Sequence, residues 1–486
     1  MINLKKNSLF KENNLQNQLP KDPLSEISLK QLGEKIKTRQ VSCEELTKSY
    51  LDRIRLLNKN LHSYIYIDEA GAIENAVGMD KLIKSGVYLG PLMGIPIAIK
   101  DICSVDGMPT TNGSIVKSDD ITGPEGTLVK RLRSLGCIVL GKTHTVEFAL
   151  GATGLNKHKG TPKNPWDNKI HRFPGGSSSG SAVAVASGLA AFAIGTDTGG
   201  SVRIPASLTG IAGLKTTKGV WPTDGIFPLS PTLDTPGPLA RSLEDIKYIF
   251  EAYDCNKITT EKEINLKGLK LAKLGSPFTN ELDKEVSIAY EKFCKELVGK
   301  GIEIETLDIP EALERTNLFP PIVGSEIVAA FGLKRFLKEV DNMDPVTAKR
   351  AKVGLDIKSI EYLGHQNRLK ELEILASNFF EKYDALVSPT TIMRAMKVED
   401  SEIDGPLHDR SLLSSANTQP ANLFNLCGIN YPIQRFCSDF NTSTCLPVGF
   451  QVICANNADQ KAIKIGLALE KEFGKPILPD VNAFLD

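Results

Sequence analysis

The sequence has no excess of charge of either sign. Among its 486 residues, Lys+Arg and Asp+Glu number 58 each, so the formal net charge is zero. A protein that binds nucleic acid or an anionic membrane surface through electrostatics carries a basic surplus. We therefore expect no nucleic acid and no membrane among the partners of this chain.

Long apolar runs, internal repeats and interdomain linkers are also missing. No run approaches the roughly 20 apolar residues that span a bilayer. Residues 1–7 are followed by a polar stretch over 13–21 and offer no apolar signal-peptide core. The length could hold two or three domains. Because nothing resembles a linker, we expect a polar N-terminal arm over 1–24 and one large domain over 25–486.

Histidine is scarce and cysteine is scattered. None of the six His residues stands in an HExxH-like spacing, and none of the nine Cys residues belongs to a CxxC pair. We therefore predict no metal site and no cofactor. An odd, scattered set of cysteines indicates reduced, mostly structural thiols, as in a cytoplasmic protein.

Strand and helix patterns alternate along the chain. A strand pattern over Gly268–Leu274, a helix pattern over Leu282–Val298 and a strand pattern over Ile302–Leu307 form a β-α-β unit. This predicts an α/β fold: a single large domain with a mixed central β-sheet covered by helices. Further strands are expected at Leu92–Lys100, Cys137–Leu140, Leu189–Ile194, Ala385–Pro389 and Pro447–Ile453.

Several signals mark where helices begin and where loops lie. Ser28–Gln31 and Ser42–Glu45 are capping boxes that open two helices near the N-terminus. The residues Asn457–Gln460 are expected to cap the last helix. The Pro/Gly-rich stretch Pro222–Pro238 is expected to be a loop.

Glycine and serine are concentrated in one stretch, residues 173–207. Two dense clusters, Gly175–Gly180 and Gly195–Ser201, flank a small-residue helix over Ala182–Gly188 and an apolar strand. Glycine in ordered structure loses much backbone freedom on folding. The clusters therefore indicate that backbone approaches a ligand closely or adopts unusual dihedral angles. The alternative, two flexible linkers, fits poorly with the apolar segment between them.

The chemistry of these clusters does not match a phosphate site. The patterns GxxxxGK[ST] and GxGxxG are absent from the two clusters, and we expect no GxSxG nucleophile elbow. Successive N–H groups of Thr198-Gly199-Gly200-Ser201 can instead converge beside the Ser201 hydroxyl and stabilise an oxyanion. A serine nucleophile needs a base. With histidine unsupported, a lysine whose pKa is lowered by burial is the next candidate.

Lys100 ends the alternating apolar segment that contains Ile95, Ile97 and Ile99. Its position at the end of a strand pattern has two interpretations. It is either a solvated strand terminus or a lysine held in a low-dielectric site. From this segment alone the solvated terminus is favoured, because buried lysines are rare.

Taken together, Gly175–Gly180, Gly195–Arg203 and the Lys100 segment resemble the amidase signature family. The resemblance runs from about residue 25 to 474 and includes Asn164–Asp167 and Leu446–Gly449. It implies a Ser–Ser–Lys triad. Ser201 would be the acylated nucleophile, Ser177 the bridging serine on a cis peptide after Gly176, and Lys100 the base. The separation of the two serines, 201 − 177 = 24, fits the family pattern.

The resemblance also implies roles for the neighbouring residues. The backbone N–H groups of Thr198, Gly199, Gly200 and Ser201 would form the oxyanion hole. Asp197, Arg203 and Ser178 would support the loop. Ile204 departs from the Gln usual in the tRNA-dependent amidotransferase subunit, which weakens that alternative.

We therefore expect an enzyme, an amidase, that hydrolyses a small-molecule linear amide to a carboxylate and ammonia or an amine. Two alternatives stay open: the glutaminase subunit of a tRNA-dependent amidotransferase, and a catalytically silent binding protein of the same fold. The sequence does not identify the amide, and residues 310–430 hold no motif for the pocket. A homodimer is an open alternative for the assembly.

Overall fold

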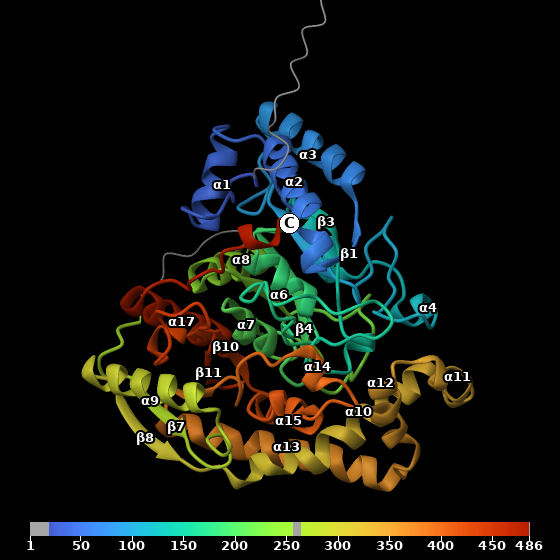
Figure 1. The fold of residues 1–486 in the computed structure, drawn as a ribbon, viewed down its shortest axis with the longest axis vertical. Helices are drawn as coiled ribbons and strands as arrows, with labels where there is room; N and C mark the ends of the chain where they lie inside the picture. Colours follow the sequence, from blue (N-terminus) through green and yellow to red (C-terminus); the bar gives the residue numbers. More distant parts are fainter. Residues whose placement is uncertain (1–18, 256–263, 486) are drawn as a thin grey trace, which may run out of the picture.

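A computed structural model of the chain describes residues 19–255 and 264–485. Most of the predicted polar arm, residues 1–18, lies outside the described residues, and residues 19–24 form no helix or strand. In Figure 1 the segment around β4, α6 and α7 lies in the middle of the molecule. Helices α1–α3 lie at one end and α10–α13 at the other.

Eleven strands in the described part of the chain form one sheet. Strands β2 and β3, β2 and β4, β7 and β8, and β7 and β9 pair in parallel, and the other neighbours are antiparallel. In spatial order they are β1 (Tyr64–Ile67), β3 (Ile138–Thr143), β2 (Pro96–Lys100), β4 (Phe192–Asp197), β6 (Thr235–Ala240), β5 (Ala212–Lys215), β10 (Cys427–Pro432), β11 (Gly449–Cys454), β9 (Ala385–Pro389), β7 (Lys270–Leu274) and β8 (Glu303–Leu307). The predicted mixed sheet is confirmed.

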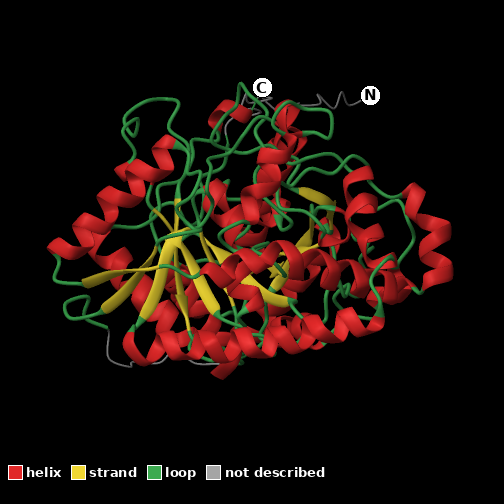
Figure 2. Ribbon diagram, turned by 90° about the horizontal axis from the view of Figure 1, so that it is seen from below, coloured by secondary structure: helices red, strands yellow, loops and turns green. Residues whose placement is uncertain are grey.

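Helices lie on both sides of the sheet (Figure 2). The α-helices are α1 (Leu29–Lys37), α2 (Cys43–Leu61), α3 (Glu69–Lys84), α4 (Asp119–Thr122), α5 (Thr127–Ser134), α6 (Ser179–Ala186), α7 (Arg203–Thr209), α8 (Leu243–Cys255), α9 (Lys284–Gly299), α10 (Arg315–Phe331), α11 (Leu333–Glu339), α12 (Pro345–Lys352), α13 (Ser359–Lys382), α14 (Val398–Ser401), α15 (His408–Leu412), α16 (Gln419–Leu423) and α17 (Asp459–Phe473). Short 3₁₀ turns are η1 (Glu147–Ala149), η2 (Pro310–Glu314), η3 (Val340–Asn342), η4 (Val353–Leu355), η5 (Leu413–Ser415), η6 (Gln434–Phe436) and η7 (Asn482–Phe484).

No single helix among the described residues is long and apolar enough to cross a membrane. One pair of segments, Pro310–Phe331 and Leu333–Asn342, reaches that length and composition together, but it is bent by 97°.

Local signals located most of these elements. Strands β7 and β8 are parallel and joined by α9, so the predicted β-α-β unit is confirmed. Ser28 and Ser42 form the expected capping boxes at α1 and α2. The predicted cap of α17 is wrong, because its N-cap is Ala458 and has no side-chain hydrogen bond. The carboxylate of Asp459 is used elsewhere, as it accepts the N–H of Thr217 at 2.8 Å.

The prediction that Pro222–Pro238 is a loop is wrong at its end. Residues Thr235–Ala240 form β6, a buried strand between β4 and β5. Pro236 and Pro238 are two residues apart, so both missing N–H groups face the same side of the strand. At Gly237 a Cβ atom would lie 2.0 Å from the Leu214 carbonyl oxygen, so glycine lets the neighbouring strand come close.

Small side chains let α6 lie entirely inside the protein. Every residue of Ser179–Ala186 is buried. The closest approach is at Gly180, where a Cβ atom would lie 2.2 Å from the Ser63 carbonyl oxygen and 2.4 Å from the His144 backbone nitrogen. The beginning of α6 is therefore held directly against the ends of β1 and β3.

We predict that Gly180→Ala lowers the free energy of unfolding by about 1–3 kcal/mol, because backbone atoms must move to admit the methyl group. Gly78→Ala is the matched control, since a Cβ atom on that residue of α3 meets nothing within 4 Å and alanine favours a helix. Urea unfolding of both variants measures the difference. Equal stability of the two variants would contradict the tight packing of α6.

Candidate active site

Lys100 is the last residue of β2 and is completely buried between β3 and β4. Its Nζ lies 2.7 Å from the Ser177 hydroxyl and 2.8 Å from the Thr196 hydroxyl. Burial disfavours the ammonium form and lowers the pKa of Lys100 to about 7. The solvated strand terminus favoured from the local sequence is therefore wrong, and Lys100 is a lysine in a low-dielectric site.

Ser177 is placed by the turn that precedes α6. The Gly176–Ser177 peptide bond is cis, as the family resemblance implied. The Ser177 side chain is completely buried, and its carbonyl oxygen accepts the N–H of Val146 at 3.2 Å. These constraints point the Ser177 hydroxyl at Lys100.

Ser201 lies at the wall of a cavity of about 310 Å³, together with Thr198 and Gly199. It is 7% exposed, whereas Lys100 and Ser177, the other two residues of the predicted triad, are completely buried. Its carbonyl oxygen accepts the N–H of Ser178 at 3.2 Å, which ties the two Gly/Ser clusters together. Among the described residues no hydrogen bond joins Ser201 to Ser177, so the relay between the two serines stays a prediction.

Ser178 braces the end of β4. Its hydroxyl accepts the N–H of Thr196 at 3.2 Å and lies 3.3 Å from the Thr196 carbonyl oxygen. Thr196 also contacts Lys100. The predicted supporting residue thus fixes one wall of the lysine site.

The four backbone donors predicted for the oxyanion hole do not behave alike. The N–H of Gly200 donates to Asp197 Oδ1 at 2.7 Å, so this member of the predicted set is occupied within the turn. The N–H groups of Gly199 and Ser201 donate to no other group of the described residues. These two, with Thr198 beside them at the cavity wall, are the donors left for a substrate.

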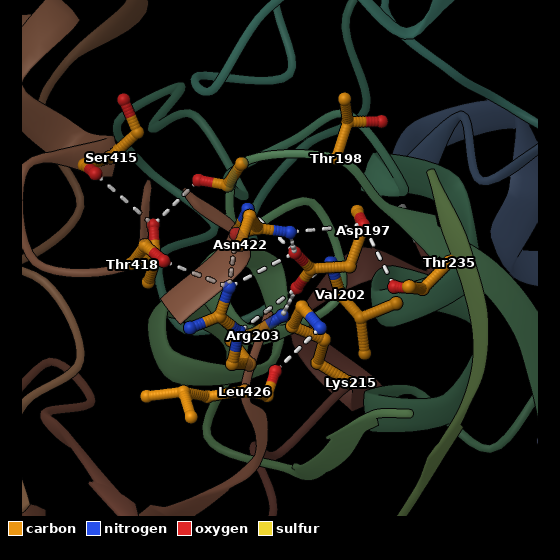
Figure 3. A network of polar contacts seen from close by, with 12 residues as sticks. Asp197, Thr198, Val202, Arg203, Lys215, Thr235, Ser415, Thr418, Asn422 and Leu426 are labelled. Atoms are coloured by element: carbon orange, nitrogen blue, oxygen red, sulfur yellow. Dashed lines mark hydrogen bonds and ion pairs between the residues drawn. The ribbon is translucent and has the colours of Figure 1, made fainter. Parts of the chain in front are cut away.

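Asp197 and Arg203 form a buried ion pair beneath the turn (Figure 3). Arg203 donates from Nε and Nη2 to the Asp197 carboxylate at 3.0 Å each. It also donates to the Gln451 side chain and the Thr418 carbonyl oxygen, at 3.1 and 3.0 Å. Burial alone would raise the pKa of Asp197, but Arg203 holds it well below its usual value. The turn that contains Ser201 is therefore held by hydrogen bonds to a buried Asp197–Arg203 ion pair.

One functional candidate was missed from the sequence, Asp234. It lies within the stretch assigned to a loop, directly before β6, and no motif marks it. Its carboxylate accepts the Thr198 hydroxyl at 2.5 Å and the Ser230 N–H at 2.9 Å. Burial raises the pKa of Asp234 to about 7. Asp234 therefore positions Thr198 at the edge of the cavity.

A group of potential metal ligands lies elsewhere. Cys437, Asp439 and Cys445, between β10 and β11, offer atoms within 4.8 Å of one another, the one such group among the described residues. Asp439 also accepts a hydrogen bond from Arg394 at 2.7 Å. None of the three lines the cavity beside Ser201. The cysteines of this group lack CxxC spacing, so the sequence alone does not predict it.

We predict that Asp197→Asn lowers the free energy of unfolding by about 3–5 kcal/mol, because it leaves the Arg203 guanidinium buried without a counter-charge. Asp120→Asn is the control. Asp120 pairs with Arg335 on the surface, where such a pair contributes at most about 1 kcal/mol. Denaturant unfolding of both variants at neutral pH checks the prediction, and similar losses would contradict it.

Comparison with known proteins identifies the family of this chain. The amidase family model matches residues 45–463. The chain is 35% identical to 2-amino-5-chloromuconic acid deaminase of Comamonas testosteroni, covering 92% of this chain and 96% of the relative. It is 33% identical to a glutamyl-tRNA(Gln) amidotransferase subunit from Acidothermus cellulolyticus, covering 93% and 96%. Peptide amidase from Stenotrophomonas maltophilia superposes with a TM-score of 0.79 at 25% identity, covering 95% of this chain and all of that one. The chain therefore belongs to the amidase family, whose members are hydrolases of carbon–nitrogen bonds.

Proposed function

We propose that this amidase cleaves a linear carboxamide through an acyl-enzyme on Ser201, with Ser177 and Lys100 as the proton relay. The observation that carries the proposal is the buried hydrogen bond of 2.7 Å between Lys100 Nζ and the Ser177 hydroxyl. Ser201, in the neighbouring Gly/Ser cluster, borders a cavity. A lysine in a dry site can be neutral near pH 7 and accept a proton.

The proposed reaction has two halves. In the first, Ser201 Oγ bonds to the amide carbon while its proton passes to Ser177 and the Ser177 proton passes to Lys100. The developing oxyanion accepts hydrogen bonds from the N–H groups of Gly199 and Ser201. The C–N bond then breaks, and the relay returns a proton to the leaving ammonia or amine. In the second half, water gives a proton to the relay while its oxygen bonds to the ester carbon. The bond between that carbon and Ser201 Oγ then breaks, the relay returns the proton to Ser201 Oγ, and the product leaves as a carboxylate.

A second candidate function is that of a glutaminase subunit in a tRNA-dependent amidotransferase. The observation in its favour is the 33% identity to a relative of that name over nearly the whole of both chains. Ile204, which stands where the subunit usually carries Gln, borders the cavity and argues for a different pocket. Co-purification of a larger partner with glutamine-dependent ammonia release would favour this second function.

A silent binding protein of the same fold is the third alternative. The complete set of Lys100, Ser177 and Ser201 argues against it, because binding alone does not require a buried lysine beside a serine. A cytoplasmic location is part of the proposal. It is supported by the free, buried state of the eight cysteines described in the structure.

We predict that Ser201→Ala abolishes ammonia release from every substrate in a panel of aliphatic, aromatic, dicarboxylic and ureido amides, with an unchanged melting temperature. The variant loses one hydroxyl at a cavity wall and no core contact. Intact mass after reaction with a fluorophosphonate should show one adduct on the wild type and none on the variant. Ser85→Ala, at the end of α3, is the control and should keep both activity and labelling. Labelling of the Ser201→Ala protein would identify another nucleophile.

We predict that kcat/KM rises with pH along a limb whose midpoint is near pH 7 and is level above it. The pKa of Lys100 is lowered to about 7, so the charged form, which cannot accept a proton, dominates below that pH. Lys100→Arg and Lys100→Ala should both lose nearly all activity, because arginine stays protonated and alanine has no base. The pH profile of the wild type beside both variants is the measurement. Near-normal turnover of Lys100→Arg at neutral pH would make Lys100 a structural residue.

A further inference from the structure

The cavity beside Ser201 has an unbalanced charge. Among the described residues at its wall there is no Asp or Glu, but there are two arginines, Arg315 and Arg350. Arg315 is the first residue of α10, and Arg350 lies in the last turn of α12. The two side chains therefore reach the same space from separate helices.

Neither arginine forms a salt bridge within the described residues. Arg315 donates to the Gln419 side chain at 3.3 Å, and Arg350 donates to the Leu150 carbonyl oxygen at 3.1 Å. Both acceptors are neutral. Burial lowers the pKa of each guanidinium, but arginine keeps its charge in proteins. Each arginine thus brings a partly buried positive charge, with several N–H donors still available, into the cavity.

Carboxylates are present in the cavity that adjoins this one. Asp344 is the one carboxylate that acts electrostatically on Arg350. Its oxygens accept the backbone N–H groups of Lys157 and Val346, at 3.0 and 2.9 Å. Asp344, Glu402 and Asp404 line the neighbouring cavity, whose wall also includes Arg350, and none of the three lines the cavity that contains Ser201. The positive charge at the catalytic cavity is therefore uncompensated at its own wall.

The other arginines on these segments show the contrast. Arg335 of α11 pairs with Asp120, and Arg368 of α13 pairs with Glu314. Among the four arginines of α10–α13, the two at the cavity are the ones without a carboxylate partner in the described part of the chain. A buried charge without a partner is costly, which is consistent with a partner supplied by a ligand.

We propose that this cavity binds an amide that also carries a carboxylate, with the carboxylate held by Arg315 and Arg350 and the carboxamide placed at Ser201. Guanidinium groups match a carboxylate with paired hydrogen bonds. Phe319, Val323 and Leu229 supply an apolar wall for the carbons in between. A volume of about 310 Å³ is at the small end of ligand pockets, so the class is a short monoamide of a dicarboxylic acid. This inference rests on the proposed function for the identity of the cleaved bond.

The test uses substrates that differ only in the distal group. Glutaramate and pentanamide have the same five-carbon chain, one ending in a carboxylate and the other in a methyl group. Succinamate and butanamide form the same comparison one carbon shorter. We expect the kcat/KM of the wild type to be at least about 10-fold higher for the acid than for the neutral amide, because a hydrogen bond to a charged group contributes that much binding free energy. The difference should lie mainly in KM. Equal or lower values for both acids would overturn the inference, and this comparison needs no variant.

Arg315→Gln and Arg350→Gln should each reduce the acid-to-neutral ratio of kcat/KM by about 10-fold or more. Arg350→Lys should keep part of the preference, since it retains charge but loses the paired geometry. Arg335→Gln is the matched control on the surface and should leave the ratio unchanged. Ratios unaffected by both cavity variants would overturn the assignment of the arginines.

Binding to the Ser201→Ala protein separates this inference from the proposed reaction. Calorimetry should show that glutaramate binds about 10-fold or more tightly than pentanamide, and that adding Arg350→Gln removes the difference. If the acid binds in this way but the wild type cleaves no amide, the proposed function fails and the carboxylate site stands. If the wild type cleaves neutral and acidic amides alike and calorimetry shows no preference, the carboxylate site fails and the amidase function stands.

Discussion

The desolvation of Lys100 is the constraint on which the rest of the site depends. Removing an ammonium group from water is costly, and the protein meets this cost by favouring the neutral amine. That requires a strand with no solvent contact at its end. Strand β2 supplies it, because β3 and β4 lie on either side and α6 packs across them. The small residues of α6 then have a clear physical purpose: they let the helix that follows Ser177 come close enough to seal the lysine.

The second requirement is that polar groups in this dry region be satisfied. Asp197 and Arg203 achieve this with hydrogen bonds to the turn, to Asn422 and to Gln451. Lys215 lies beside them (Figure 3), and burial lowers its pKa to about 8 while Asp197 raises it. A buried network of this kind is rigid when every member is bonded. The turn before Ser201 is therefore held in place before any ligand arrives, which is what oxyanion stabilisation requires.

The charges around the lysine also act on one another. Burial pushes both Lys100 and Asp234 toward their neutral forms, and the charge of each stabilises the charge of the other. Asp234 also holds the Thr198 hydroxyl, so its protonation state bears on both the base and the edge of the cavity. Arg315 and Arg350 line the cavity beside Ser201, and neither Lys100 nor Asp234 is part of its wall.

The sequence by itself determined the local features of this protein: the capping boxes of α1 and α2, the β7–α9–β8 unit, the two Gly/Ser clusters and the order of motifs that identified the family. These depend on neighbouring residues, so a linear pattern carries them. Only the tertiary structure decided the environment of Lys100, since burial at a strand end depends on which strands lie on either side. Part of the Pro/Gly-rich stretch forms the buried strand β6 because its neighbours β4 and β5 pair with it. The tertiary structure also lets the Gly200 N–H donate to Asp197, and it places Asp234, Arg315 and Arg350 near Ser201. Asp234, Arg315 and Arg350 come from distant segments that contain no motif. The desolvation of a side chain and the charge of a cavity depend on which segments pack around them, so a linear pattern cannot show either one.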